Sequence, residues 1–208
     1  MADAAMIFVV DDDDAIRESL ELLLEASGFR TVGFPSGERF LDALAQDAAG
    51  CALVDVSMPG MGGLDVQEAL NRRHSPLPVI VMTGHGDVPL AVAAMRAGAA
   101  DFIEKPFSDE TILASIARAL ERGMEARAAQ AEAAAAAAGI DRLTEREREV
   151  MVELVAGHPN KVIAHHLSIS PRTVEIHRAR VMEKMQARSL SDLVRMALAA
   201  GISAPARK

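Results

Sequence analysis

The stretch Cys51-Ala52-Leu53-Val54-Asp55-Val56-Ser57-Met58-Pro59-Gly60 decides how this sequence folds. An apolar run leads up to one carboxylate and a Pro-Gly pair follows, a pattern that predicts a buried strand ending in a turn. In open α/β sheets the functional site lies outside the carboxyl ends of the strands. Taken alone, Asp55 fits an acid that merely ends a strand; the other strand ends make it the candidate reactive group.

Four more apolar segments alternate with amphipathic helices in the first part of the chain. Strands alternating with helices at this pace predict an α/β fold, a doubly wound five-stranded parallel sheet with helices on both faces. The four additional strands are expected at residues 6–10, 31–34, 77–82 and 101–104.

Residues 140–203 contain no strand signal and predict a second, all-α domain. Thr144 and Glu147 have the spacing of a capping box, and the second helix is expected from Asn160 to Leu167. Ser170 caps a third helix that has Pro171 at its first position, and Ser191 opens a fourth. A helix, a tight turn and a capped helix form a helix-turn-helix pattern.

The charge is divided along the chain. Residues 1–122 hold 20 acidic and 9 basic residues, whereas residues 123–208 hold 10 acidic and 13 basic residues. This division predicts an acidic domain over 1–122 and a basic one over 141–208 that meets a polyanion. Residues 123–140, rich in Ala, predict a solvent-exposed helical linker that ends at Gly139, with Gly123 as its expected hinge or break.

Several classes of protein are disfavoured by composition. The single cysteine, Cys51, implies no disulfide and suits the reducing cytoplasm. The first ten residues lack the basic region of a signal peptide, and no apolar run approaches the length of a membrane span. The absence of Trp and Tyr argues against stacking on exposed bases.

Polar groups follow four of the predicted strands. A parallel sheet gathers these ends at one edge, and crowded carboxylates there require a cation such as Mg²⁺ or Ca²⁺. A lysine and a hydroxyl supply the charge and hydrogen bonds that a transferring phosphoryl group needs, with Asp55 as the nucleophile that becomes an aspartyl phosphate. A hydrolase site is the alternative, for which His85 is the only nearby histidine. The gathered residues are Asp11, Asp12, Asp55, Thr83 and Lys105.

At these positions the sequence resembles a two-component receiver domain followed by a LuxR-type output domain, as in the FixJ subgroup of response regulators. The resemblance covers nearly the whole chain except the Ala-rich linker. It is carried by Val10-Asp11-Asp12, Asp55 with Met58-Pro59-Gly60, Thr83-Gly84-His85-Gly86-Asp87, Phe102-Ile103-Glu104-Lys105-Pro106-Phe107, Leu143-Thr144-Glu145-Arg146-Glu147 and Ser170-Pro171-Arg172-Thr173-Val174-Glu175-Ile176-His177-Arg178.

The resemblance implies a role for each receiver residue. Asp55 accepts phosphate from a sensor histidine kinase. Asp12, Asp55 and the backbone carbonyl of Ser57 bind Mg²⁺, assisted by Asp11. Thr83 and Lys105 bind phosphoryl oxygens, and Phe102 is the rotamer switch. The resemblance also implies a cis Lys105-Pro106 bond and receiver pairing through residues 88–97, 101–104 and 109–120.

The third helix of the output domain separates into faces at 100° per residue. Val174, Val181 and Met185 fall on the side expected to face the core. The opposite side is expected to enter the DNA major groove, and the flanks, with the start of the preceding helix, to meet phosphates. The groove candidates are Arg172, Glu175, Ile176, Ala179 and Glu183; the phosphate candidates are Thr173, His177, Lys184, Arg178, Asn160 and Lys161.

The sequence therefore predicts a cytoplasmic transcription factor, not an enzyme, that phosphorylation of Asp55 activates. As partners the resemblance implies the kinase, RNA polymerase, an inverted-repeat DNA site and a second copy that pairs through residues 191–200. Activation rather than repression is a family expectation. The alternatives are a metal-dependent phosphatase and a constitutive DNA-binding protein whose receiver serves only for protein contact.

Overall fold

The structure is a computed structural model that describes residues 5–84 and 88–202. It divides into two compact units, Met1–Arg127 and Ala128–Lys208. The division falls inside the expected linker 123–140 rather than at either of its ends.

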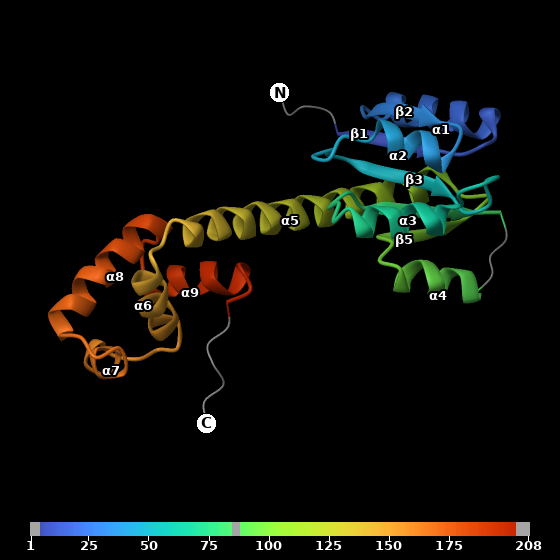
Figure 1. Ribbon diagram of the computed structural model, residues 1–208. Helices are drawn as coiled ribbons and strands as arrows, with labels where there is room; N and C mark the ends of the chain where they lie inside the picture. Colours follow the sequence, from blue (N-terminus) through green and yellow to red (C-terminus); the bar gives the residue numbers. More distant parts are fainter. Residues whose placement is uncertain (1–4, 85–87, 203–208) are drawn as a thin grey trace. The chain divides into compact units, whose positions relative to one another are not determined.

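The first unit is built on a five-stranded, all-parallel sheet with the strand order β2-β1-β3-β4-β5 (Figure 1). This is the predicted doubly wound sheet. The strands are β1 (Met6–Val10), β2 (Arg30–Phe34), β3 (Cys51–Asp55), β4 (Val79–Thr83) and β5 (Asp101–Glu104).

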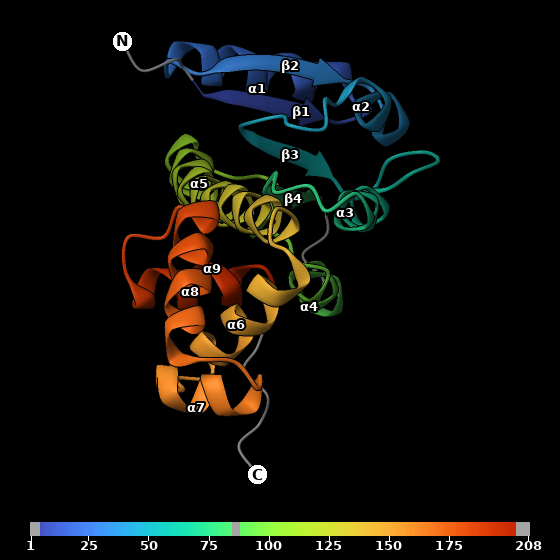
Figure 2. The same cartoon turned by 60° about the vertical axis from the view of Figure 1, so that its left-hand side comes forward.

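Helices cover both faces of this sheet, as both views show (Figures 1 and 2). Successive residues of a strand point to opposite faces, so Ala52 and Val54 join one apolar core while Cys51 and Leu53 join the other. The first core is closed by α2, α3 and α4, and the second by α1 and α5 (Asp109–Asp141). The first four helices are α1 (Asp14–Ala26), α2 (Gly37–Ala43), α3 (Gly63–Arg72) and α4 (Val88–Arg96).

Helix α5 (Asp109–Asp141) corrects two expectations for the linker. The helix passes through Gly123 without a break. A Cβ atom at Gly123 would lie 2.9 Å from Cδ of Pro78, so close packing explains this glycine. The linker is also not wholly exposed, because Ala136 and Ile140 are buried.

The second unit surrounds one apolar core with short helices. Thr144 and Glu147 form the predicted capping box of α6, and Ser170 caps α8 with Pro171 at its first turn. Helix α9 is capped by Ser189, two residues earlier than expected, because the Ser189 side chain accepts from the backbone N–H of Asp192. The helices are α6 (Glu145–Val155), α7 (Asn160–His166), α8 (Pro171–Met185) and α9 (Leu190–Ala199).

Among the described residues, no helix combines the length and apolar character needed to cross a membrane.

Candidate functional site

Strand register brings the predicted acidic residues together. Val10 pairs with Val54, so Asp11 follows β1 at the level where β3 ends in Asp55. Thr83 pairs with Glu104, so Lys105 follows β5 beside the end of β4. The backbone N–H of Lys105 donates to the carbonyl of Thr83 at 2.7 Å. The carboxyl edge of the sheet thus gathers these side chains from four strands.

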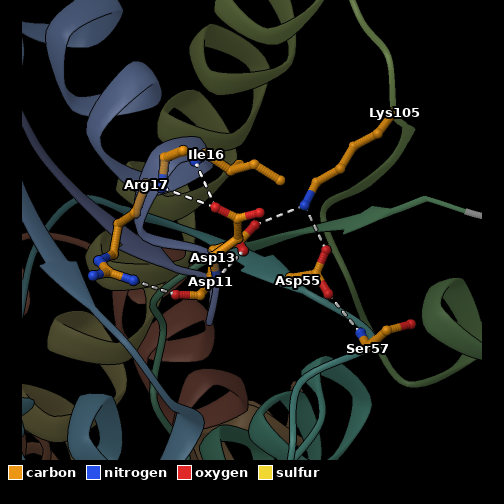
Figure 3. Close-up of polar contacts among 8 residues, drawn as sticks. Asp11, Asp13, Ile16, Arg17, Asp55, Ser57 and Lys105 are labelled. Carbon is orange, nitrogen blue, oxygen red and sulfur yellow. Dashed lines mark hydrogen bonds and ion pairs between the residues drawn. The ribbon is translucent and has the colours of Figure 1, made fainter.

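The Lys105 ammonium lies between two buried carboxylates (Figure 3). Its Nζ atom donates to Asp11 Oδ2 and to Asp55 Oδ1, at 2.6 Å in each case. Burial is the largest single influence on the pKa of Lys105 and lowers it, but the hydrogen bonds and charges of Asp11 and Asp55 together outweigh burial. The pKa of Lys105 is therefore raised above its ordinary 10.5, and the side chain supplies a permanent positive charge.

Asp55 is only 6% exposed, and the loop after β3 fixes the orientation of its side chain. The backbone N–H of Ser57 donates to Asp55 Oδ2 at 2.6 Å (Figure 3). The following loop returns against the strand end, where a Cβ atom at Gly63 would lie 2.7 Å from the Asp55 carbonyl oxygen. Both carboxylate oxygens of Asp55 therefore have a donor from a different element.

The four acids after β1 take four different positions. Asp11 is buried, and its Oδ1 accepts from the backbone N–H of Asp13 at 3.0 Å. Asp12 is exposed at the rim of the site, and Asp13 caps the first turn of α1. Asp14 pairs with Arg17, which also donates to the Asp11 carbonyl at 2.8 Å. The roles of Asp13 and Arg17 were not predicted, although an acid directly before an amphipathic helix is a recognised N-cap signal.

The donors at this edge suit a hard divalent cation. Asp11 and Asp55 already hold one cationic group, the Lys105 ammonium, in a nearly buried position. Carboxylate and carbonyl oxygens are the ligands that Mg²⁺ prefers. The predicted set of Asp12, Asp55 and the Ser57 carbonyl, with Asp11 beside it, therefore fits Mg²⁺.

The predicted switch residues lie on the two strands beside β3. Thr83 is 1% exposed at the end of β4. Phe102 pairs with Val81 across the ladder, and its half-buried ring packs against the core under α2, α3 and α4. The Lys105-Pro106 peptide bond is cis, as the resemblance implied. His85, Gly86 and Asp87 of the β4 motif lie outside the described residues.

In the second unit, α8 has the predicted faces. Val174, Val181 and Met185 are buried in the core. On the other side, a shallow hollow is lined by Arg172, Glu175, Ile176 and Ala179, and Glu183 on the same side is exposed. Ile176 is 49% exposed on this side of the helix.

The predicted phosphate contacts differ in their surroundings. Lys161 is exposed, and Thr173 and His177 are half-buried. Arg178 donates to Asn160 Oδ1 over a long 3.5 Å, which links α8 to the start of α7. Lys184 also has a partner inside the domain: its Nζ pairs at 2.6 Å with the buried carboxylate of Glu147.

Comparison with protein families assigns both units. A family model described as "Response regulator receiver domain" matches residues 7–117. A second, described as "Bacterial regulatory proteins, luxR family", matches residues 141–197.

Individual relatives match along nearly the whole chain. The transcriptional regulatory protein FixJ of Bradyrhizobium diazoefficiens is 49% identical over 94% of this chain and 96% of its own length. The transcriptional regulatory protein FixJ of Rhizobium meliloti is 50% identical over 94% of this chain and 96% of its own length. These relatives are regulators, so the alternative of a small-molecule phosphatase finds no support.

Solved structures agree with this assignment. The crystal structure of full-length FixJ from B. japonicum is 49% identical, with a TM-score of 0.58 over 95% of this chain and 97% of that one. The response regulator StyR is 37% identical, with a TM-score of 0.78 over 94% of this chain and 99% of that one.

Proposed function

Because this chain belongs to the two-component response regulators that join a receiver domain to a LuxR-type DNA-binding domain, we propose that phosphorylation of Asp55 controls its binding to DNA. The observation that carries the proposal is the arrangement around Asp55. This buried carboxylate is held by Ser57 and Lys105 at the edge where Thr83 also ends its strand.

The donors around Asp55 suit a phosphoryl group arriving from the phosphohistidine of a kinase. An Asp55 oxygen attacks phosphorus as the bond from phosphorus to the imidazole nitrogen breaks. The Lys105 ammonium neutralises charge on the transferred group, and the Thr83 hydroxyl donates to one of its oxygens. Receiver domains generally bind Mg²⁺ here; Asp12, Asp55 and the Ser57 carbonyl would hold the ion, which supplies further charge neutralisation.

The switch converts this local event into dimerisation. Thr83 moves toward the phosphoryl group, Phe102 turns inward, and the surface formed by α4, β5 and α5 rearranges. Large apolar side chains on α4 already face solvent: Val88, Val92 and Met95 are 74%, 44% and 48% exposed. An unpartnered apolar stripe of this kind suits pairing with a second receiver.

The output domain reads DNA through α8. Arg172 suits a guanine edge, Glu175 a cytosine amino group, and Ile176 or Ala179 a thymine methyl. Two domains paired through α9, on which Leu190 and Leu198 are exposed, read an inverted repeat. We propose that the bound dimer acts in the cytoplasm as an activator that recruits RNA polymerase.

The test compares the native chain with Asp55→Asn after treatment with acetyl phosphate. Light scattering should show dimers, and operator affinity should rise, only in the native chain. Arg172→Ala should still dimerise but lose about 1–3 kcal/mol of operator affinity. Full DNA binding by Asp55→Asn under these conditions would defeat the proposal.

Beryllofluoride provides an independent test because it mimics the phosphoryl group on Asp55. DNA affinity that is equal with and without beryllofluoride would favour the constitutive DNA-binding protein instead.

A further inference from the structure

Three potential metal ligands converge in the output domain, on α6, on α7 and in the turn between them. Glu153 lies on α6, His158 in the turn that follows, and His166 in the last turn of α7. Glu153 Oε2 lies 2.7 Å from His158 Nδ1 and 2.9 Å from His166 Nδ1. One ligand atom from each side chain lies within 4.8 Å of the other two.

The local fold, rather than chance proximity, holds these side chains together. Gly157 adopts φ +81°, a conformation that L-residues avoid, and it reverses the chain after α6. The backbone N–H of His158 then donates to the carbonyl of Glu153 at 3.1 Å. The rings of His158 and His166 meet edge to face, with centroids 5.1 Å apart. Three separate positions are thereby directed at one point.

The chemistry of this set differs from that of the receiver site. Two imidazole nitrogens and one carboxylate oxygen are typical ligands for Zn²⁺ and related late first-row ions, whereas Mg²⁺ prefers oxygen donors alone. Tetrahedral coordination at about 2.0–2.1 Å requires ligand atoms roughly 3.3 Å apart. The two observed separations from the carboxylate oxygen would therefore widen by only a few tenths of an ångström.

The position of the cluster allows an ion to enter. The side chains of Glu153, His158 and His166 are 20%, 35% and 43% exposed, so solvent reaches the cluster and can supply a fourth ligand. The competing interpretation is a hydrogen-bonded triad, in which one carboxylate accepts from two histidines and no metal is involved. In that triad both nitrogens point at the carboxylate oxygen, so an ion between the three groups would require the side chains to turn toward it.

We propose that Glu153, His158 and His166 form a binding site for a divalent transition-metal ion, with Zn²⁺ as the best-matched ion. A bound ion would join α6, the α6–α7 turn and α7. It would stabilise the start of the helix-turn-helix, where Asn160 and Lys161 are placed.

The experiment titrates Zn²⁺ into the full chain, prepared without an affinity tag and stripped with a chelator. Millimolar Mg²⁺ is included to occupy the receiver carboxylates. Calorimetry should show one Zn²⁺ per chain, and the unfolding temperature should rise on binding because the ion favours the folded state. Co²⁺ in place of Zn²⁺ should give the visible absorption of a four-coordinate nitrogen and oxygen site.

Variants distinguish Zn²⁺ binding at the proposed ligands from Zn²⁺ binding at other histidines. His158→Ala and His166→Gln should each weaken Zn²⁺ binding by at least about tenfold. His165→Gln is the control because His165 is exposed on the same helix and supplies no ligand atom to the cluster, although its ring meets that of His166 with centroids 6.2 Å apart; the Zn²⁺ affinity of this variant should change little. His166 is exposed enough for its replacement to leave the core intact, and circular dichroism checks this.

Two results would overturn the proposal. One is the absence of a saturable Zn²⁺ site in the native chain, which would leave only the hydrogen-bonded triad. The other is equal Zn²⁺ affinity in the His165 and His166 variants, which would place the ion elsewhere. Neither result bears on phosphorylation of Asp55.

Discussion

Lys105 satisfies two carboxylates that the fold has removed from water. Asp11 and Asp55 are almost fully buried, and each places one oxygen 2.6 Å from the same ammonium. Removing one partner of a buried charge pair leaves the remaining charge without compensation, which costs more than the pair itself contributed. The receiver therefore depends on this lysine for stability as well as for its proposed chemistry.

Replacing Lys105 by Met should destabilise the receiver by about 2 kcal/mol at neutral pH without divalent cations, because Asp11 and Asp55 then repel each other. Millimolar Mg²⁺ should recover part of this loss, since it supplies the missing positive charge. Urea unfolding with and without Mg²⁺ measures both effects. Arg39→Met, which replaces an exposed base of the same domain, should change little. Equal losses with and without Mg²⁺ would refute this explanation.

Glu147 provides a second residue-scale test, in the output domain. The pKa of Glu147 is lowered from 4.5 to about 2. The main cause is the Lys184 ammonium at 2.6 Å, and the second is the hydrogen bond from the backbone N–H of Thr144 at 2.8 Å. A lowered pKa stabilises the folded state above the ordinary pKa, and this contribution disappears as the pH falls from about 4.5 toward 2.

Glu147→Gln should therefore cost about 2 kcal/mol of output-domain stability at pH 6, and the difference from the native chain should narrow at pH 3. Urea unfolding at both pH values measures this. Glu145→Gln serves as the control, because Glu145 lies in the same first turn but is exposed. A difference that stays constant between the two pH values would contradict the assigned pKa.

At the scale of elements, α5 takes part in both units. Gly123 and Arg127 lie in the first unit, where Arg127 donates to the carbonyls of Asp47 and Ala48 at 2.9 and 2.8 Å. Ala136 and Ile140 lie in the second unit and are buried there. Helix propensity predicted a helical linker for this Ala-rich segment with a hinge or break at Gly123, whereas its continuity and packing could be read only from the structure.

Gly123→Val should destabilise the receiver by about 1–3 kcal/mol, because its Cβ would lie 2.9 and 3.0 Å from two atoms of the rigid Pro78 ring. Ala126→Val places the same β-branched side chain at an exposed position of α5 and should cost only the small difference in helix propensity. Thermal unfolding compares the two variants. Equal stability of the two variants would show that the contact with Pro78 does not account for Gly123.

At the scale of the whole molecule, the proposed regulation requires phosphorylation of Asp55 to change the surface of α4. Val92 is 44% exposed there, in a stripe of apolar side chains that points into solvent in the single chain. A charge placed in this stripe should block pairing without disturbing the phosphorylation site.

Val92→Asp should accept phosphate normally but remain monomeric with beryllofluoride, and its operator affinity should then stay at the unphosphorylated level. Light scattering and DNA-binding titration measure the two quantities. Leu22→Asp is the matched control because Leu22 is 70% exposed on α1, on another surface, and should leave dimerisation intact. Normal dimers of Val92→Asp would exclude this face of α4 from the interface.

The part of the candidate site that lies at the strand ends could be predicted from the sequence. Asp11, Asp55, Thr83 and Lys105 follow apolar runs, and parallel strands bring such positions to one edge whatever the details of packing. The buried side of α8 followed from helical periodicity in the same way. The ion pair between Lys184 and Glu147 was not predicted, because the two residues are 37 positions apart in the sequence.

The sequence by itself determined the elements, their order, the acidic edge and the helix-turn-helix, since these depend on local periodicity, capping and the rules of parallel sheets. Tertiary structure decided which charged groups neutralise one another. It showed Lys105 between Asp11 and Asp55, Lys184 on Glu147, and Glu153 between two histidines. The physical reason is that side-chain pairing depends on separations of a few ångströms between distant residues, and local sequence patterns do not encode these distances.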